Sequence, residues 1–401
     1  MPNNETMWSL EQPVLVVAPH LIHPARNGAD ISLERVARFL SLHTVLVDLV
    51  GCDTVRRYQG GDLVRETPFA NRMRSKRVGG VRALLKRSHY LLERFNTPQI
   101  SRIVEQMFVT ERYGTVLASY LTTLPLLPIR MPGQRYLVWT HNDDFKWFED
   151  LLQQVKNPMG RQVARVSLNW LQRAVPRLAQ EAVFLHVTEK DWQGFERVAP
   201  GHRHLIVSIG TDIDVNPVWP TVEESSPIIL TFTGGLAVQM ATDALRHFHD
   251  TFEATLKAAF GARLRIRVVG SRPSEAVRSM VAQNVWELYA DVSDEALSSL
   301  LRESTFTILP FAYATGVKLK LIRSLGSGIP FLSTSQSRFD RLELPTICCC
   351  SDDPQQWLAT ANAWIALPDK LGAHRALLEV ARGYSWPACV RALAEELKRF
   401  E

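Results

Sequence analysis

The most informative stretch of the sequence is Leu309-Pro-Phe-Ala-Tyr-Ala-Thr-Gly-Val-Lys-Leu-Lys-Leu-Ile-Arg-Ser-Leu-Gly-Ser-Gly-Ile-Pro330. An apolar run typical of a buried strand leads through Thr315 and Gly316 into residues whose apolar side chains recur at helical spacing. Lys318 and Lys320 therefore fall in the first turn of a predicted helix, where a cation opposes the helix dipole. A bound anion would offset this charge, and a diphosphate is an anion that suits a helix N-terminus.

Short apolar runs alternate with helical stretches on both sides of this segment. The predicted strands are 14–18, 44–50, 115–120, 136–140, 182–187 and 205–208, then 228–233, 264–269, 285–289, 305–309, 330–332 and 346–349. The main predicted helices are 31–42, 99–112, 159–180, 240–260, 294–302 and 318–325. This alternation is typical of parallel sheets covered by helices, so we predict an α/β protein.

The length of the chain indicates two domains. It has 401 residues, whereas a single core rarely grows beyond about 250–300 residues. A Pro-, Ser- and Glu-rich segment makes the best linker candidate. We predict two doubly wound Rossmann-like domains at 1–210 and 228–383, a linker at 211–227, and a C-terminal helix at 384–401 that returns to the first domain. Ligands would bind in the cleft between the two sets of strand ends.

The basic residues are concentrated in one segment, 71–94. The formal net charge of the chain is +5, and this segment holds eight basic residues against Glu93 alone: Arg72, Arg74, Lys76, Arg77, Arg82, Lys86, Arg87 and Arg94. A local patch does not indicate nucleic-acid binding. It indicates a face for anionic lipid or a phosphorylated substrate, with Leu84, Leu85, Leu91, Leu92 and Phe95 behind the charges. The alternative is a solvated face over a core-packed apolar stripe.

Neither the cysteines nor the chain ends indicate secretion or a metal site. Three of the five cysteines are consecutive, Cys348 to Cys350, which fits neither a disulfide framework nor a spaced metal site. Small buried side chains in a reducing cytoplasm are the simpler interpretation. The start of the chain lacks the pattern of a signal peptide, and no run reaches the roughly 18 apolar residues of a membrane span.

Polar loops follow several strands of the first half. Asn27 and Gly28 lie in a loop before a helix, where backbone can approach a ligand, although a plain connection is the alternative. His20 and His23 lie on the same loop with no third ligand in register, so a metal is not expected there.

Two further clusters follow later strands. His141, Asn142 and Asp143 could hydrogen-bond a sugar or phosphate, or cap the next helix. Thr188 and Glu189 pose the same choice, and Thr188 is a plausible N-cap. In the second half Gly234, Gly235 and Gly270 end predicted strands and would let a ligand approach the backbone, but each is a weak signal alone.

Taken in order, these segments resemble the GT-B glycosyltransferases of the large retaining nucleotide-sugar family, group 1. The resemblance covers nearly the whole chain. Its motifs are Pro24-Ala-Arg-Asn-Gly-Ala29, Thr140-His-Asn142, Val187-Thr-Glu-Lys-Asp191, Ser208-Ile-Gly-Thr-Asp212, Thr315 to Phe331, and Tyr384-Ser-Trp386.

The resemblance implies transfer of a sugar from a nucleotide diphosphate, held by the second domain, to a glycan or lipid-linked acceptor held by the first. It implies retention at the anomeric carbon and no metal or other cofactor. Lys318 and Lys320 would contact the diphosphate, backbone near Gly234, Gly235 and Gly316 would approach it, and His141 would contact the sugar or its phosphate. We expect surface polysaccharide or glycolipid synthesis in the cytoplasm, with a peripheral location on the inner face of the membrane.

One departure from the family pattern concerns the donor helix. The family usually has a glutamate where this chain has Arg323, and the earlier glutamate of the same signature falls near Thr315. A guanidinium reverses both the charge and the hydrogen-bond polarity of a carboxylate. Either Arg323 binds a phosphate or a carboxylate of an altered donor, or the chain is a degenerate GT-B protein that binds nucleotide, glycan or a partner without transfer.

Overall fold

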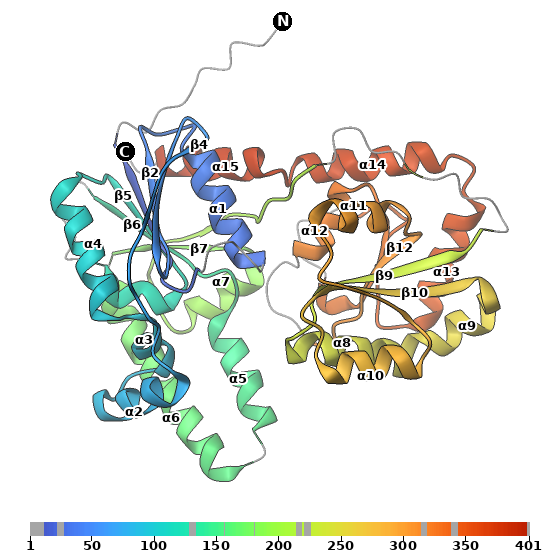
Figure 1. Cartoon of the computed structure of the whole chain (residues 1–401), viewed down its shortest axis with the longest axis horizontal. Helices are drawn as coiled ribbons and strands as arrows, with labels where there is room; N and C mark the ends of the chain where they lie inside the picture. The colour runs from blue at the N-terminus through green and yellow to red at the C-terminus, as the bar shows by residue number, and fades with distance from the viewer. Residues whose placement is uncertain are drawn as a thin grey trace, which may run out of the picture. The chain divides into compact units, whose positions relative to one another are not determined.

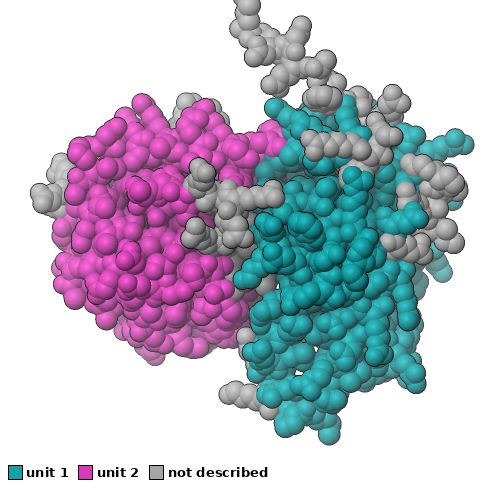
Figure 2. Space-filling view, turned by 180° about the vertical axis from the view of Figure 1, so that it is seen from behind, with its two compact units in different colours: residues 1–209, 389–401 teal, residues 210–388 magenta. Residues whose placement is uncertain are grey.

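The chain forms two compact units, which Figure 2 shows in different colours, and Figure 1 labels the helices and strands that form them. The computed structural model describes residues 12–21, 28–127, 134–155, 157–179, 181–213, 219, 226–313, 319–337 and 344–398. Unit 1 comprises Met1–Ile209 with Cys389–Glu401, and unit 2 comprises Gly210–Ala388. The sequence places the changes of domain at 210 and 384; in the structure the second change lies inside the last helix, α15 (Trp386–Lys398). Much of the predicted linker lies outside the described residues.

Unit 1 is built on an eight-stranded sheet with the order β4-β3-β2-β1-β5-β6-β7-β8. The strands are β1 (Val14–Val17), β2 (Val47–Val50), β3 (Thr54–Gln59), β4 (Asp62–Pro68), β5 (Thr115–Ser119), β6 (Arg135–Trp139), β7 (Val183–His186) and β8 (His204–Ile206). Six of these strands pair in parallel, as the sequence predicts. The four residues of β1 are all buried, which explains its continuous run of apolar side chains.

The antiparallel strands β3 and β4 at one edge were not predicted. They form a hairpin around Gly60 and Gly61, whose positive φ angles of 57° and 87° suit a tight hairpin turn. The arginines of β3 make the segment look like an exposed loop in the sequence. In the structure Arg57 donates to the buried Asp48 carboxylate on β2 at 2.8 and 2.9 Å, so its charge is paired within the fold. Unit 1 therefore has a doubly wound sheet with an added antiparallel edge.

Helices cover the unit 1 sheet. They are α1 (Gly28–Leu40), α2 (Lys76–Lys86), α3 (Tyr90–Phe95), α4 (Pro98–Thr110), the 3₁₀ helix η1 (Leu121–Leu126), α5 (Asp144–Gln154), α6 (Pro158–Ala179) and α7 (Glu189–Glu196). Leu15 and Val17 of β1 share a buried apolar cluster with Ile100 of α4 and Leu168 of α6. This cluster is the core that fixes the loops at the strand ends.

Unit 2 is built on a six-stranded parallel sheet with the order β11-β10-β9-β12-β13-β14. The strands are β9 (Ile228–Gly235), β10 (Leu264–Ser271), β11 (Glu287–Ala290), β12 (Phe306–Leu309), β13 (Phe331–Ser333) and β14 (Cys349–Cys350). The helices are α8 (Gln239–Phe248), α9 (Ala254–Phe260), α10 (Glu275–Gln283), α11 (Asp294–Arg302), α12 (Leu319–Gly326), α13 (Pro354–Ala366) and α14 (Lys370–Arg382). A π-helical turn, His249–Glu253, joins α8 to α9 in the segment predicted as one helix.

Strand order identifies one favoured ligand edge in each unit. In unit 1, β1 lies between β2 and β5, and in unit 2, β9 lies between β10 and β12. The chain winds away in opposite directions from these points, and ligands of doubly wound folds bind outside the carboxyl ends of the strands there. Functional side chains are therefore expected after β1, β5, β9 and β12. None of the helices among the described residues combines the length and apolar character that crossing a bilayer requires.

Candidate functional site

Two glycines shape the carboxyl end of β9 in unit 2. Gly234 pairs with Gly270 of β10. A Cβ on Gly270 would lie 1.8 Å from the carbonyl oxygen of Gly234, so only glycine allows these strands to approach so closely. A Cβ on Gly235 would meet nothing within 4 Å. The backbone at Gly235 thus faces open space, as a ligand-approach site requires.

The ammonium group of Lys320 lies directly over Gly234. A Cβ on Gly234 would come within 2.4 Å of Lys320 Nζ. The same Nζ lies 5.1 Å from the ring centroid of Phe232 and 5.0 Å from that of Phe311. Ring faces attract cations, so the two rings hold the charge at the carboxyl ends of β9 and β12. This is the edge that the strand order singles out.

Helix α12 is fixed against β12 below this lysine. Ser324 Oγ lies 2.6 Å from Thr307 Oγ1 and donates to the carbonyl oxygen of Lys320 at 2.9 Å. The apolar side of the helix is buried through Leu321, Ile322 and Leu325. The backbone that carries Lys320 is therefore rigidly placed. Thr315, Gly316 and Lys318 were predicted at the same site and lie outside the described residues.

Arg323 follows Lys320 on α12 by three residues, so both lie on one side of the helix. Its side chain is 41% exposed, and Nη2 lies 3.9 Å from Asp294 Oδ1, a carboxylate that is 92% exposed. An exposed pair at this distance holds the guanidinium only weakly. Arg323 is therefore available to a ligand near Lys320.

In unit 1 a stack of rings occupies the equivalent strand ends. His141, which follows β6, stacks on Trp139 at 4.5 Å and packs on Tyr120 at 4.4 Å between ring centroids. His20, which follows β1, meets the edge of Tyr120 at 4.7 Å. His141 Nε2 lies 3.0 Å from Ser119 Oγ, at the end of β5. The stack thus joins the ends of β1, β5 and β6.

The backbone and the charge state of this stack are both unusual. Tyr120 and His141 have φ angles of 65° and 57°, which are uncommon for residues with a side chain and often occur at functional sites. Burial lowers the pKa of His141 to about 3, with a smaller contribution from His20. Burial lowers the pKa of His20 to about 4. Both imidazoles are therefore neutral near pH 7 and can act as hydrogen-bonding groups rather than as cations.

Thr188 caps helix α7. Its hydroxyl accepts from Asp191 N at 3.1 Å, and Asp191 Oδ2 accepts from Thr188 N at 3.1 Å, which completes a capping box. Asp191 Oδ1 also accepts from Asp143 N at 2.9 Å and so ties the start of α5 to the start of α7. This geometry gives Thr188 a structural role whether or not a ligand contacts it.

Three of the other residues predicted for unit 1 lie among the described residues, after β6, β7 and β1. Asn142 is half-buried, and its backbone N–H donates to the carbonyl oxygen of Thr140 at 2.7 Å. Glu189 is the half-buried first residue of α7. Gly28 begins α1, and Asn27 lies outside the described residues.

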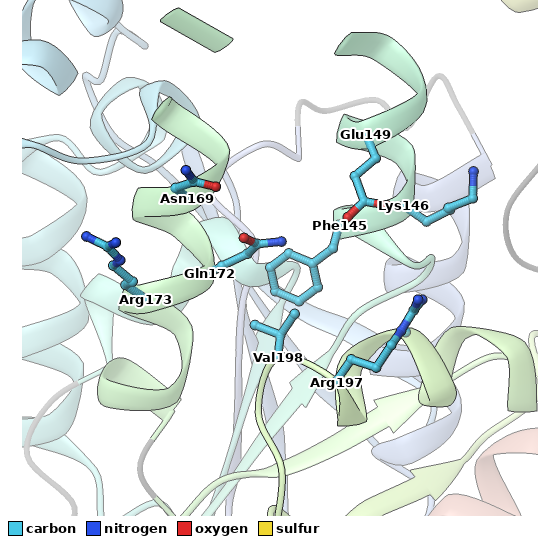
Figure 3. Close-up of a pocket in the computed structure, with 9 residues that line it drawn as sticks. Phe145, Lys146, Glu149, Asn169, Gln172, Arg173, Arg197 and Val198 are labelled. Atoms are coloured by element: carbon cyan, nitrogen blue, oxygen red, sulfur yellow. The ribbon is translucent and has the colours of Figure 1, made fainter. Parts of the chain in front are cut away.

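A cavity of about 500 Å³ opens between α5, α6 and α7 of unit 1 (Figure 3). In Figure 3 the amide of Gln172 reaches from α6 toward the ring of Phe145 on α5. The remaining lining residues are Lys146, Glu149, Asn169, Arg173, Gly194, Arg197 and Val198. Amides, cations and one carboxylate around a partly apolar floor can hydrogen-bond a polyhydroxyl ligand. No local sequence pattern predicts this cavity, because its lining residues come from α5, from α6, and from α7 with the two residues that follow it.

The described residues contain no group of three or more His, Cys, Asp or Glu side chains that could hold a metal ion. The chemistry that their geometry supports at the unit 2 edge is anion binding by an ammonium, a guanidinium and exposed backbone.

Residues 227–366, which lie inside unit 2, match the family model "Glycosyl transferases group 1". Unit 2 contains a group 1 glycosyltransferase domain. The match includes Gly234, Gly235, Gly270, Lys320 and Arg323. No curated protein matches the sequence.

Solved structures resemble the chain over nearly its whole length. Sucrose-phosphate synthase from Thermosynechococcus elongatus is 13% identical with a TM-score of 0.65, covering 97% of this chain and 99% of that one. The catalytic domain of starch synthase IV from Arabidopsis thaliana, bound to ADP and acarbose, is 11% identical with a TM-score of 0.64 and the same coverage. HepE from Anabaena in complex with UDP-glucose is 12% identical with a TM-score of 0.60, covering 97% and 100%. The predicted GT-B fold is thereby confirmed.

Proposed function

We propose that this protein transfers a sugar from a nucleotide diphosphate to a glycan or lipid-linked acceptor, with retention at the anomeric carbon and without a metal ion. The observation that carries this proposal is the placement of Lys320 over Gly234, at the carboxyl ends of β9 and β12. An anion bound there meets an ammonium group, glycine backbone and the beginning of α12 together.

The chemical role of Lys320 follows from where charge develops. When the bond from the sugar to the diphosphate breaks, negative charge accumulates on the departing diphosphate oxygens. A fixed cation stabilises that charge more in the transition state than in the bound donor, which is how electrostatic catalysis lowers a barrier. Lys318, two residues earlier in the sequence, would add a second cation, and Arg323 would bind a phosphate or a carboxylate of the donor.

The donor is proposed to be a nucleotide diphosphate sugar. HepE binds UDP-glucose and the starch synthase IV domain binds ADP, so uridine and adenosine diphosphate sugars are the first donors to test. Arg323 in place of a glutamate favours a donor with an additional negative charge, such as a carboxylate on the sugar.

Unit 1 would hold the acceptor. The neutral His141 can hydrogen-bond a sugar hydroxyl or phosphate oxygen without adding charge. The cavity between α5, α6 and α7 offers further polar groups, including Gln172 and Arg197.

A Gln172→Ala variant should raise the KM for acceptor while the KM for donor stays unchanged.

We place this reaction in the cytoplasm at the inner face of a membrane, in surface polysaccharide or glycolipid synthesis.

The test is metal-free calorimetric binding of a panel of nucleoside diphosphates and nucleotide sugars. Wild type, Lys320→Ala and Arg323→Glu would be compared. One nucleotide sugar that binds wild type and is lost in Lys320→Ala would support the proposal. No binding by wild type, with binding gained in Arg323→Glu, would favour the alternative of a degenerate GT-B protein.

A further inference from the structure

Helix α2 of unit 1 exposes apolar side chains on one face. Leu85 is 80% exposed, Val81 59% and Val78 50%, and Leu84 beside them is 54% exposed. Positions 78, 81 and 85 lie three and four residues apart, so they form one stripe along the helix. The sequence left open whether the apolar residues of this segment pack into the core. Leu92 of α3 does so, but the stripe on α2 does not.

The opposite face of α2 explains why the helix is nevertheless well formed. Gly79 is buried against α3, where a Cβ would lie 3.3 Å from Arg94 Cβ. Arg82 and Lys86 pair with Glu93 of α3 at 3.5 and 3.2 Å. The Ser75 hydroxyl caps the helix start by accepting from Val78 N. The exposed stripe is therefore held on a folded helix and is not a frayed end.

Cations border the stripe. Arg77 and Arg87 are exposed and form no ion pair within the described part of the chain. Arg72 is exposed just before the helix, and Lys86 is exposed at its end. A solvent-facing apolar stripe of this kind costs free energy in water, and such patches mark interaction surfaces. A partner that suits it must accept apolar side chains and carry negative charge.

We propose that α2 docks the protein on the surface of an anionic lipid bilayer. Val78, Val81 and Leu85 enter the boundary between headgroups and acyl chains, and Arg72, Arg77 and Arg87 lie among the phosphates. This is the arrangement of an interfacial amphipathic helix, in which apolar burial and electrostatic attraction act together. The docking surface deepens the membrane location proposed above by naming the helix that would provide it, and it does not depend on sugar transfer.

The experiment is co-sedimentation of the full chain with phosphatidylcholine vesicles, with and without phosphatidylserine. We expect binding only to the vesicles that contain phosphatidylserine. Binding should weaken as salt approaches about 1 M, where the screening length falls to about 3 Å. Arg77→Gln with Arg87→Gln should reduce affinity about 30-fold, since each cation near the surface contributes about 1 kcal/mol. Val81→Gln with Leu85→Gln should reduce it by about tenfold or more.

Matched controls come from α4 of the same unit and the residues just after it. Val109 is 88% exposed, and Arg102 and Arg112 are exposed cations. Val109→Gln, and Arg102→Gln with Arg112→Gln, change the same kinds of side chain away from α2 and should leave vesicle binding within about twofold of wild type. All variants alter exposed side chains, so thermal unfolding should confirm that each remains folded.

Three results would overturn the proposal. The first is a wild type that does not bind phosphatidylserine vesicles. The second is equal loss of binding in the α2 and α4 variants, which would indicate a nonspecific charge effect. The third is a wild type that self-associates in solution and becomes monomeric in Val81→Gln with Leu85→Gln, which would assign the stripe to a second copy of the chain. Because no sugar donor is present, failure of the proposed sugar transfer would not affect any of these readouts.

Discussion

The carboxyl-end edges of the two sheets are built in opposite ways. In unit 1 the edge is filled by its own rings, His20, Tyr120 and His141, and both imidazoles are neutral. In unit 2 the edge is kept clear by Gly234 and Gly235, and it carries a cation, Lys320, supported by two aromatic rings.

Two sheets of the same class can thus differ at their strand ends in both charge and packing, and we expect them to suit different ligands. The filled strand ends of unit 1 are uncharged, and both ring nitrogens of His20 and Nδ1 of His141 are buried. The open strand ends of unit 2 carry a fixed cation, which suits an anionic ligand. The unit 2 edge should therefore depend on charge and the unit 1 edge on packing.

The largest expected effect is on the unit 2 charge. Lys320→Ala should lower turnover of the donor, measured as release of nucleoside diphosphate, by about 100- to 1,000-fold, because one preorganised electrostatic contact is lost. Thermal stability should change little, since the lysine is only half-buried. Lys320→Arg should recover part of the rate. Turnover by Lys320→Ala equal to that of wild type would show that the unit 2 edge does not depend on this charge.

A second prediction tests whether the close approach of β9 and β10 in unit 2 requires a glycine at position 270. Gly270→Ala places a Cβ 1.8 Å from the carbonyl oxygen of Gly234, which is backbone and cannot rotate away. We expect a loss of about 3 kcal/mol in the free energy of unfolding, measured by urea denaturation. Gly235→Ala is the matched control, because its Cβ would meet nothing within 4 Å. Similar losses in both variants would contradict this account.

A third prediction concerns acid and unit 1. Among the described residues of unit 1, burial lowers the pKa of five histidines: His20 and His89 to about 4, His141 and His186 to about 3, and His204 by a smaller amount. Below pH 6.5 the unfolded chain binds protons that these folded imidazoles do not, so stability falls as pH falls toward 4. Burial raises the pKa of four described carboxyl groups of unit 1, which act in the opposite sense: Glu34, Asp143, Asp144 and Asp191.

The carboxyl groups offset part of the effect of the imidazoles, so the stability of unit 1 should fall with pH by less than the imidazoles alone would give. Hydrogen exchange followed from pH 6.5 to 4 should therefore show unit 1 losing protection before unit 2. If unit 2 loses protection first, the packing of neutral imidazoles is not what stabilises the unit 1 edge.

The smallest effect separates helix capping from ligand contact. Thr188→Ala removes the hydroxyl of a capping box and should lower the free energy of unfolding by about 1 kcal/mol. Ser274→Ala, at the N-cap of α10 in unit 2, is the matched control and should cost a similar amount. A much larger fall in turnover for Thr188→Ala than for Ser274→Ala would give Thr188 a role in ligand binding as well.

Most of the fold could be predicted because each buried parallel strand is a continuous apolar run. Val14–Val17 and Phe306–Leu309 are entirely buried, and their sequences show it. The β3–β4 hairpin was not predicted because β3 carries Arg56 and Arg57, whose charges are paired within the fold. The Gly60-Gly61 pair, between two short runs that each contain a β-branched residue, Val55 and Val64, was the signal that could have found it.

The candidate site could be predicted only in part. A glycine at a strand end and a lysine in the first turn of a helix can each be recognised from neighbouring residues alone. Gly234, Gly270 and Lys320 could therefore be singled out from the sequence. The rings that hold Lys320, Phe232 and Phe311, come from two different strand ends, and no local pattern pairs them. The sequence predicts no metal at His20, but it does not predict the packing of His20 on Tyr120, which depends on the adjacency of β1 and β5.

The chain enters and leaves unit 2 at neighbouring points. Thr211 N donates to the carbonyl oxygen of Tyr384 at 2.8 Å, and Thr211 forms a parallel bridge with Ser385. Unit 2 is thus an insertion whose two ends are already fastened together, and neither sheet is divided by it. An exchange of unit 2 between related chains would therefore have both of its ends at one place in the structure. Such an exchange would replace Lys320 and the glycines beside it together, while leaving the sequence of α2 and of the unit 1 rings unchanged.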